Sequence, residues 1–261
     1  MVIMRTVFCF TTVCTYLIFV NLAISSAVRA ETLPQGDCEA PAAHTDLTKC
    51  SFAGKNLPRL DLQGANLDGV DFSNAKLPGC DLSGTSLKKA DLKWADLGDC
   101  RIIGSNLSEA DLFHTTFDGG TLDQSIFIKA NMFGANLNEV RALGADFSHA
   151  YMKDVAMEEG NFGDANFTNA FMQRAVLIDS RLVGANFHES VLTGAALESA
   201  DLSRARITHA LLNGAHLEQA TLVNADVNQT QWTNSVLDDA DFTDVRNASA
   251  GLKKMLTALD Q

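Results

Sequence analysis

The most regular feature of the chain is an apolar residue at every fifth position, with a small residue two positions before it, from about Cys50 to Asp244. An α-helix needs apolar positions about 3.6 residues apart and a β-strand needs a spacing of about 2, so neither element fits as a long segment. The chain is therefore predicted to turn once in every five residues. The apolar positions are Phe52, Leu57, Leu62, Leu67, Phe72 and every fifth residue onward to Leu237 and Phe242.

Individual five-residue segments carry a resemblance to a known family. ANLDG, ADLKW, ADLGD, ANLNE, ADFSH, ANFTN and ADLSR are similar to the A(D/N)LXX consensus of pentapeptide-repeat proteins, and the match covers about three-quarters of the chain. The resemblance implies an all-β fold, a right-handed quadrilateral parallel β-helix with four repeats per coil, over residues 50–244. The function stays open, because one fold supports many functions.

Residues 1–30 differ in composition from the repeats and are predicted to be a signal peptide. One charge, Arg5, precedes an apolar run over about residues 7–24, and the small residues Val28 and Ala30 fit cleavage after Ala30. A cut after Ala27 fits nearly as well. Export would place the protein in the periplasm or outside the cell. The alternative is an uncleaved membrane anchor facing outside the cytoplasm, because the run approaches the roughly 20 residues that a bilayer requires.

Both ends of the repeat region are predicted to be closed by other structure. Residues 31–49 are expected to form an N-terminal cap segment. Residues 245–261 are expected to form a short amphipathic helix, with Asn247 or Ser249 at its start. Its apolar stripe consists of Leu252, Met255, Leu256 and Leu259. This helix is expected to cover the end of the core; the alternative is dimerisation through the helix, which the resemblance implies because similar proteins dimerise at this terminus.

Four cysteines remain once the predicted signal is removed, in a compartment that permits disulfides. Cys38 and Cys50 flank the segment before the regular repeats and are predicted to form a disulfide. Cys80 and Cys100 are 20 residues apart, which is one coil of the implied fold, so both would lie at one corner about 4.8 Å apart. That separation permits a disulfide. The alternative is two buried thiols in the position usually held by alanine.

Counting residues modulo 20 sorts the outward positions of the implied fold into columns. One column that is otherwise polar carries four consecutive apolar residues, which form an apolar ridge roughly 15 Å long, from the coil spacing. Contiguous exposed apolar surface is typical of an interface, so a protein partner or a second copy of the chain is predicted to bind here. The alternative is that the chain's own tail covers it. The ridge comprises Tyr151, Phe171, Val191 and Leu211, with Phe113 and Phe133 nearby and Trp94 at its edge.

A second set of outward columns forms an acidic face. The formal net charge is −12, and loss of Arg5 and Arg29 with the signal, two positive charges, would bring it to −14. Solubility is the favoured role; the alternatives are docking of a basic partner and loose binding of divalent cations. No basic patch for nucleic acid is present. The face comprises Glu158, Glu159, Glu198, Glu218 and Asp238, with Asp99, Asp118, Glu139, Asp179 and Asp239.

The chain is predicted not to be an enzyme and to use no cofactor. It lacks G-x-S-x-G, phosphate-loop and dinucleotide motifs, and a narrow helix filled with Leu, Phe and Met leaves no substrate cavity. The histidines fall on different faces or non-adjacent coils, so no Cys/His group has the spacing of metal ligands and no metal site is predicted. They are His44, His114, His149, His188, His209 and His216.

Two classes of function remain. The favoured one is an exported, non-enzymatic scaffold that binds a protein partner or itself through the apolar ridge. The alternative comes from the resemblance, because some acidic pentapeptide-repeat proteins imitate duplex DNA, bind the type II topoisomerase DNA gyrase and protect it from quinolones. That target is cytosolic, so the predicted signal peptide favours the scaffold.

Overall fold

The computed structural model describes residues 32–259. The chain divides into two units, Met1–Leu33 and Pro34–Gln261. Of the first unit only Thr32 and Leu33 are described, so the predicted signal peptide lies outside the described residues. Within residues 32–259, every helix is too short or too polar to span a bilayer.

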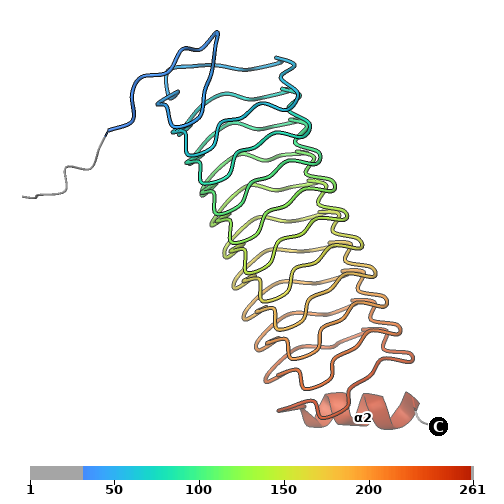
Figure 1. Ribbon diagram of the computed structural model, residues 1–261. Coiled ribbons are helices and arrows are strands. Elements are labelled where there is room, and N and C mark those ends of the chain that lie inside the picture. The colour runs from blue at the N-terminus through green and yellow to red at the C-terminus, as the bar shows by residue number, and fades with distance from the viewer. Residues whose placement is uncertain (1–31, 260–261) are drawn as a thin grey trace, which may run out of the picture. The chain divides into compact units, whose positions relative to one another are not determined.

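The second unit is a rod of stacked coils, with the helix α2 (Ala250–Leu259) at its C-terminal end (Figure 1). Parallel β-bridges join each coil to the next at a spacing of 20 residues, from Asp46↔Asn66 to Asp226↔Arg246. One bridged position lies in each repeat, and among the described residues the bridges are isolated, so no longer strand forms. The predicted right-handed quadrilateral β-helix is confirmed.

A hydrogen-bonded turn, present in most repeats, explains the five-residue spacing. The N–H of Ala65 donates to the carbonyl oxygen of Leu62 at 3.0 Å, and Gly64 between them has a φ of 62°. A type II turn needs positive φ at this third position. Positive φ recurs at every fifth residue from Gly54 to Asp244. Gly, Asn and Asp tolerate this conformation best, which fits their recurrence at these positions.

The commonest residues at the outward position before an apolar centre are Asp and Asn, because their side chains complete a local hydrogen bond. Oδ1 of Asp71 accepts a hydrogen bond from the N–H of Ser73 at 2.8 Å. Oδ1 of Asn166 accepts the equivalent bond from the N–H of Thr168 at 3.1 Å. An apolar residue at this position cannot make the bond.

The core is a ladder of apolar side chains. Ala142 is a shortened apolar centre, and Phe162, one coil further on, is fully buried. A β-carbon at Gly160 would overlap the ring of Phe162. Glycine at this small position therefore makes room for the ring. Along one column the rings stack at 4.9–5.1 Å between centroids, in the order Phe127, Phe147, Phe167 and Phe187.

Regular coil pairing begins earlier than Cys50, where the sequence analysis started it. Asp46 already pairs with Asn66 across 20 residues, and Leu47 is fully buried as an apolar centre. Leu47 lies five residues before Phe52 and so extends the repeat by one unit. Residues 46–49 therefore belong to the first coil, and the irregular cap is shorter than predicted.

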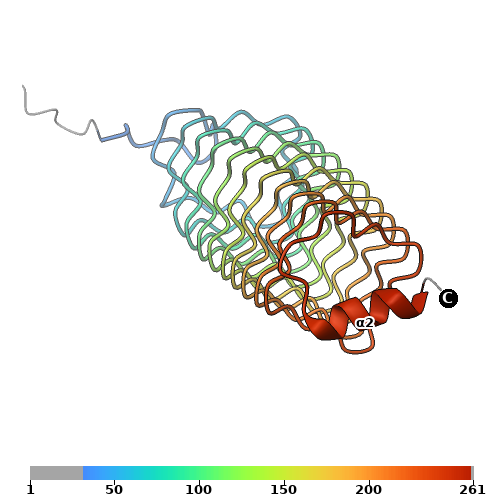
Figure 2. The same cartoon turned by 90° about the horizontal axis from the view of Figure 1, so that it is seen from below.

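The helix α2 packs against the last coil, as Figures 1 and 2 show. Oγ of Ser249 accepts a hydrogen bond from the N–H of Leu252 at 3.2 Å, and its carbonyl oxygen accepts one from Lys253 at 3.0 Å. Ser249 is thus the N-cap. Leu252 is buried, while Met255 and Leu256 are half-buried against the core. The predicted C-terminal helix is confirmed, and its packing favours the role of an end cap.

Candidate interaction surface

Four residues of the apolar ridge occupy one column of paired positions. Bridges join Tyr151 to Phe171, Phe171 to Val191, and Val191 to Leu211. The structure therefore brings together the four residues that the sequence count placed in one column. Earlier coils carry carboxylates at the same column position, at Asp71, Asp91 and Asp111.

Aromatic side chains extend this column toward the N-terminus. Phe113 stacks on Phe133 with 5.4 Å between ring centroids, and Phe133 stacks on Tyr151 at 6.1 Å. Tyr151 in turn stacks on Phe171 at 5.3 Å. Phe113 and Phe133 come from turn positions, so the ridge passes from a corner of the rod onto a flat side between residues 133 and 151. The result is one continuous aromatic ladder.

Trp94 lies at the N-terminal end of the ladder. Its ring stacks on His114 with 4.4 Å between centroids and meets Phe113 edge to face at 5.5 Å. Trp94 was expected at the edge of the ridge, whereas His114 was not among the predicted ridge residues. Trp94 and His114 hold the same turn position in successive coils, so a count by 20 residues predicts that they are neighbours.

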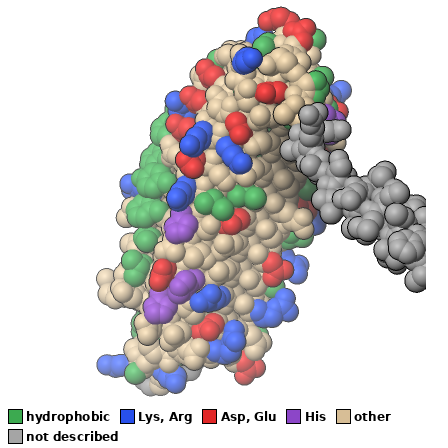
Figure 3. Space-filling view, turned by 90° about the vertical axis from the view of Figure 1, so that its left-hand side faces the viewer, with side chains coloured by type: hydrophobic (Ala, Val, Ile, Leu, Met, Phe, Trp, Pro, Cys, Tyr) green, Lys and Arg blue, Asp and Glu red, His purple; other side chains and the backbone are tan. Residues whose placement is uncertain are grey.

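Solvent reaches the ridge unevenly. Trp94 is 56% exposed and Tyr151 is 42% exposed. Phe171, Val191 and Leu211 are half-buried between their neighbours, so the ridge is less exposed than the sequence alone suggests. In the space-filling view, hydrophobic side chains gather along one edge of the rod (Figure 3). A narrow strip of rings fits contact with another macromolecule better than it fits enclosure of a small ligand.

The acidic face is less uniform than the sequence suggests. Glu158, Glu159 and Asp238 are exposed, whereas Glu198 and Glu218 are half-buried. Other carboxylates on the rod are paired with arginines of the next coil: Asp81 with Arg101 at 3.3 Å, Asp123 with Arg141 at 2.8 Å, and Asp154 with Arg174 at 2.6 Å. Positive charge thus interrupts the negative charge along the rod.

Local partners lower the pKa of several carboxyl groups. A hydrogen bond from Arg174, together with its charge, lowers the pKa of Asp154 below its ordinary value. Hydrogen bonds from the side chain and backbone of Ser73 lower the pKa of Asp71. These groups are ionised at neutral pH, which is the opposite of what a general acid needs.

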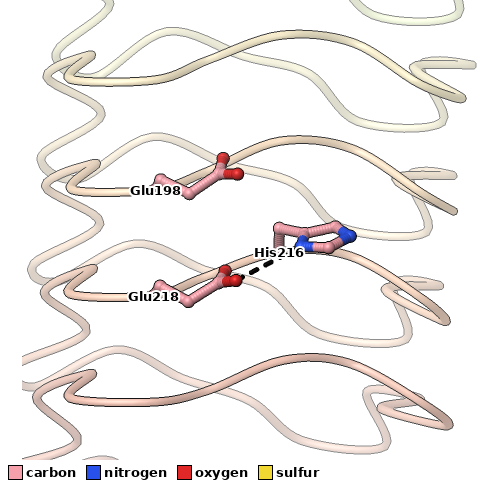
Figure 4. Close-up of side chains that lie close together, drawn as sticks. All are labelled: Glu198, His216 and Glu218. Atoms are coloured by element: carbon pink, nitrogen blue, oxygen red, sulfur yellow. Dashed lines mark hydrogen bonds and ion pairs between the residues drawn. The ribbon is translucent and has the colours of Figure 1, made fainter.

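The structure also brings His216 together with Glu198 and Glu218, two residues of the predicted acidic face. Glu198 and Glu218 hold the same position in successive coils, and His216 precedes Glu218 by two residues. One ligand atom from each of the three lies within 4.8 Å of the others (Figure 4). The histidines were expected to lack metal-ligand spacing with one another and with the cysteines, and carboxylates were not included in that comparison. Including carboxylates in the same count would have found this group.

Both candidate cysteine pairs are disulfide-bonded in the structure. The Cα atoms of Cys38 and Cys50 are 5.3 Å apart, and those of Cys80 and Cys100 are 4.6 Å apart. Cys80 and Cys100 are buried inside the rod, at the small position of their repeats. Neither pair contributes to the ridge.

Shallow hollows on the described surface lie near the two ends of the rod. One is bordered by residues 41–43 and 56–61, and two lie beside α2. All three are open to solvent, and residues of the apolar ridge border none of them. The ridge is therefore separate from these hollows.

Two family models match the repeat region. The model described as a pentapeptide repeat region matches residues 45–127, and the one described as pentapeptide repeats in eight copies matches segments between residues 130 and 231. The chain belongs to the pentapeptide-repeat family. Pentapeptide-repeat proteins are generally structural or binding proteins rather than enzymes. No curated protein sequence matches the chain.

Solved structures of other pentapeptide-repeat proteins are similar to this chain. HetL from the cyanobacterium Nostoc sp. strain PCC 7120 is 26% identical over 75% of this chain and 89% of its own, with a TM-score of 0.31. A trypsin-treated form of QnrB1, a plasmid-mediated fluoroquinolone resistance protein, is 22% identical over 77% of this chain and 98% of its own, with a TM-score of 0.49. A protein from the Arabidopsis thaliana thylakoid lumen is 22% identical over 54% of this chain and 71% of its own, with a TM-score of 0.26. The family assignment rests on the family models and on the repeat itself.

Proposed function

We propose that this pentapeptide-repeat protein is an exported, non-enzymatic scaffold that binds a protein partner or a second copy of itself through the apolar ridge. The observation that carries the proposal is the continuous ladder of side chains from Trp94 to Phe171, continued by Val191 and Leu211. At the outward positions of Tyr151, Phe171, Val191 and Leu211, an Asp or Asn would complete a local hydrogen bond. The apolar residues cannot make this bond. Coverage of the ridge by another chain would offset that loss.

The backbone presents the ridge in a fixed shape. The N–H of Tyr151 donates to the carbonyl oxygen of Ala130 at 2.9 Å, and the N–H of Phe171 donates to that of Ala150 at 2.9 Å. A preformed surface loses little conformational entropy on binding. Large aromatic side chains at the centre of an interface often supply most of its binding energy. Tyr151 and Phe171 are therefore the residues on which we expect binding to depend most.

The alternative function is DNA mimicry, in which the acidic rod would bind DNA gyrase. The net charge of −12 supports this alternative. The arginines that pair with Asp81, Asp123 and Asp154 support it less, because they place positive charge between the carboxylates. Gyrase is cytosolic, so the compartment of the mature protein separates the two functions.

The double substitution Tyr151→Glu and Phe171→Glu tests the ridge. We expect the wild-type chain to self-associate in sedimentation velocity, or to capture a partner from the extracytoplasmic fraction of native cells, and the double variant to do neither. Its circular dichroism spectrum should be unchanged, because both side chains lie outside the core. Ser51→Glu, at an exposed position of the same column outside the ridge, should behave as wild type. Association that survives the double substitution would rule out the ridge.

Sequencing the N-terminus of the protein from fractionated native cells tests export. A start at Glu31 or Val28, outside the cytoplasm, is the expected result. An intact Met1 in the cytosol would contradict export and favour the gyrase alternative. An intact Met1 in the membrane fraction would mean that the rod is anchored rather than released.

A further inference from the structure

Three side chains from two successive coils converge on the outside of the rod. His216 and Glu218 are two residues apart and both point outward, and Glu198 holds the position of Glu218 one coil earlier (Figure 4). The bridge Ala196↔His216 and the hydrogen bond from the N–H of Ser199 to the carbonyl oxygen of Glu218, at 2.9 Å, fix the register of the two coils. The backbone therefore holds the three side chains together without help from a loop.

Each glutamate has an oxygen atom that is buried and lacks a partner. Oε2 of Glu198 and Oε2 of Glu218 accept no hydrogen bond and have almost no exposed surface, although the two side chains as a whole are partly exposed. Leaving a buried acceptor unpaired costs free energy, and two carboxylates one coil apart also repel each other. Among the described residues, no Lys or Arg forms an ion pair with either carboxylate; Nδ1 of His216 lies 3.3 Å from Oε1 of Glu218. A cation bound to both carboxylates would offset their mutual repulsion.

The neighbouring residues separate this group from the rest of the acidic face. In the column of the imidazole, the coils on either side carry Ala196 and Val236, which offer no polar atom. In the glutamate column, Ile178 separates the pair from Glu158. Asp238 follows on the other side, but the residue beside it is Val236 and not a histidine. The group is thus a discrete set of one nitrogen and two carboxylate donors.

We propose that Glu198, His216 and Glu218 bind a divalent transition-metal ion, with Zn²⁺ as the ion that fits best. Imidazole nitrogen together with carboxylate oxygen suits Zn²⁺, whereas Ca²⁺ takes six or more oxygen ligands. Zn²⁺ accepts three protein ligands with water in the fourth position. Ligand atoms around a tetrahedral Zn²⁺ ion lie about 3.4 Å apart. Small rotations of the flexible glutamate side chains would bring the three ligand atoms from within 4.8 Å of one another to that separation. The bound ion would link two coils in a column separate from the apolar ridge.

Isothermal titration of ZnCl₂ into the full chain tests the site. We expect saturable binding of one ion per chain and a rise in the thermal midpoint with added Zn²⁺. Glu198→Gln, His216→Ala and Glu218→Gln should each weaken Zn²⁺ affinity by at least about tenfold, because even loss of an outer partner of a metal ligand costs about 10–100-fold. The absorption spectrum of added Co²⁺ should change on binding to wild type and not on addition to His216→Ala.

Two matched variants separate this site from nonspecific binding. Glu158→Gln removes a carboxylate from the same column where no histidine lies beside it, and His209→Ala removes a histidine outside the group. Both should keep the wild-type affinity, and circular dichroism should show that all five variants are folded. Three results would overturn the proposal: no saturable Zn²⁺ binding, binding that is unchanged in His216→Ala, or an equal loss in Glu158→Gln or His209→Ala.

Discussion

At the outward position before each apolar centre, one side-chain hydrogen bond governs which residues fit. Asp71 and Asn166 both accept a bond from the N–H two residues further on, so the charge of the aspartate is not needed for the turn. The charge matters instead for solubility and for the response to pH. At the position two residues before each apolar centre, the residue must be small for steric reasons, as Gly160 beside Phe162 shows. The hydrogen bond at the first position and the steric limit at the second each lead to a prediction for one residue.

Replacing Asp71 with Asn should reduce the sensitivity of the fold to acid. Hydrogen bonds from Ser73 lower the pKa of Asp71 below its ordinary value of 3.8, so the folded state binds this proton less tightly than the unfolded chain does. The resulting stabilisation is present above the unfolded pKa and is lost as pH falls through the lower folded pKa. Urea unfolding at pH 7 and at about pH 3 should show a larger loss of unfolding free energy for wild type than for Asp71→Asn. Equal losses in the two proteins would show that the lowered pKa of Asp71 does not contribute to the acid sensitivity of the fold.

Replacing Gly160 with Ala should destabilise the rod by about 1–3 kcal/mol, because the added methyl group overpacks a filled core. The ring of Phe162 is the group that must move. A double-mutant cycle with Phe162→Leu isolates this contact: Gly160→Ala should cost less free energy when the ring is absent. Chemical denaturation of the four proteins measures the difference. Equal costs in the two backgrounds would show that the ring is not the obstacle.

At the scale of elements, α2 is unlike the rest of the molecule, because it is the one described segment with a helical spacing of apolar residues. Ser249 starts the helix and Leu252 is buried against the last coil. Trp232 and Leu237, both nearly buried, belong to that coil. Without the helix, these apolar side chains would face solvent at an open end. We therefore expect α2 to cover the open end of the core. A further coil could not do this, because it would itself leave an open end.

Replacing Leu252 with Ala should lower the free energy of unfolding by about 2 kcal/mol or more, as loss of a buried leucine side chain does. It should also promote end-to-end association, which analytical ultracentrifugation would detect. Lys253→Ala changes the exposed neighbour and should alter stability by no more than about 0.5 kcal/mol. If α2 instead mediates dimerisation, Leu252→Ala would decrease association.

At the scale of the whole molecule, the 20-residue register makes the solenoid tolerant of some deletions and sensitive to others. Each coil contacts only the coils beside it, so removal of one whole coil leaves every column aligned. Removal of a single repeat keeps the apolar centres inside but turns all later columns by one side of the rod. Surface features that extend over many coils therefore depend on register, whereas burial of the core does not.

Two deletions should separate the fold from the ridge. Deleting residues 136–140 removes one repeat and moves Tyr151 to a different side of the rod from Phe133. Deleting residues 131–150 removes one coil and brings Phe113 to the place beside Tyr151 that Phe133 holds. Both proteins should keep the circular dichroism spectrum of the parent, but only the deletion of residues 131–150 should keep the association. Retained association in both would show that a continuous ladder is unnecessary.

The sequence predicts the solenoid because burial in this fold depends on a local count. Leu67 and Phe162 are buried at the positions that the five-residue spacing assigns to them. The same count, extended to 20 residues, predicts which residues share a column, such as Tyr151 and Phe171. It does not predict how far a long side chain reaches across coils. The ion pair between Arg174 and Asp154 depends on that reach, so it needed the structure.

The chain has two tryptophans, and the structure puts them in contrasting surroundings. Trp94 is 56% exposed at the end of the ridge and Trp232 is 5% exposed near α2. Indole fluorescence depends on solvent contact, so an occupant on the ridge should shift the emission of Trp94 to shorter wavelength. Release of the C-terminal helix should shift that of Trp232 to longer wavelength. The protein thus carries a built-in optical reporter for each of these two regions, and replacing either indole with Phe would leave the other signal to be followed alone.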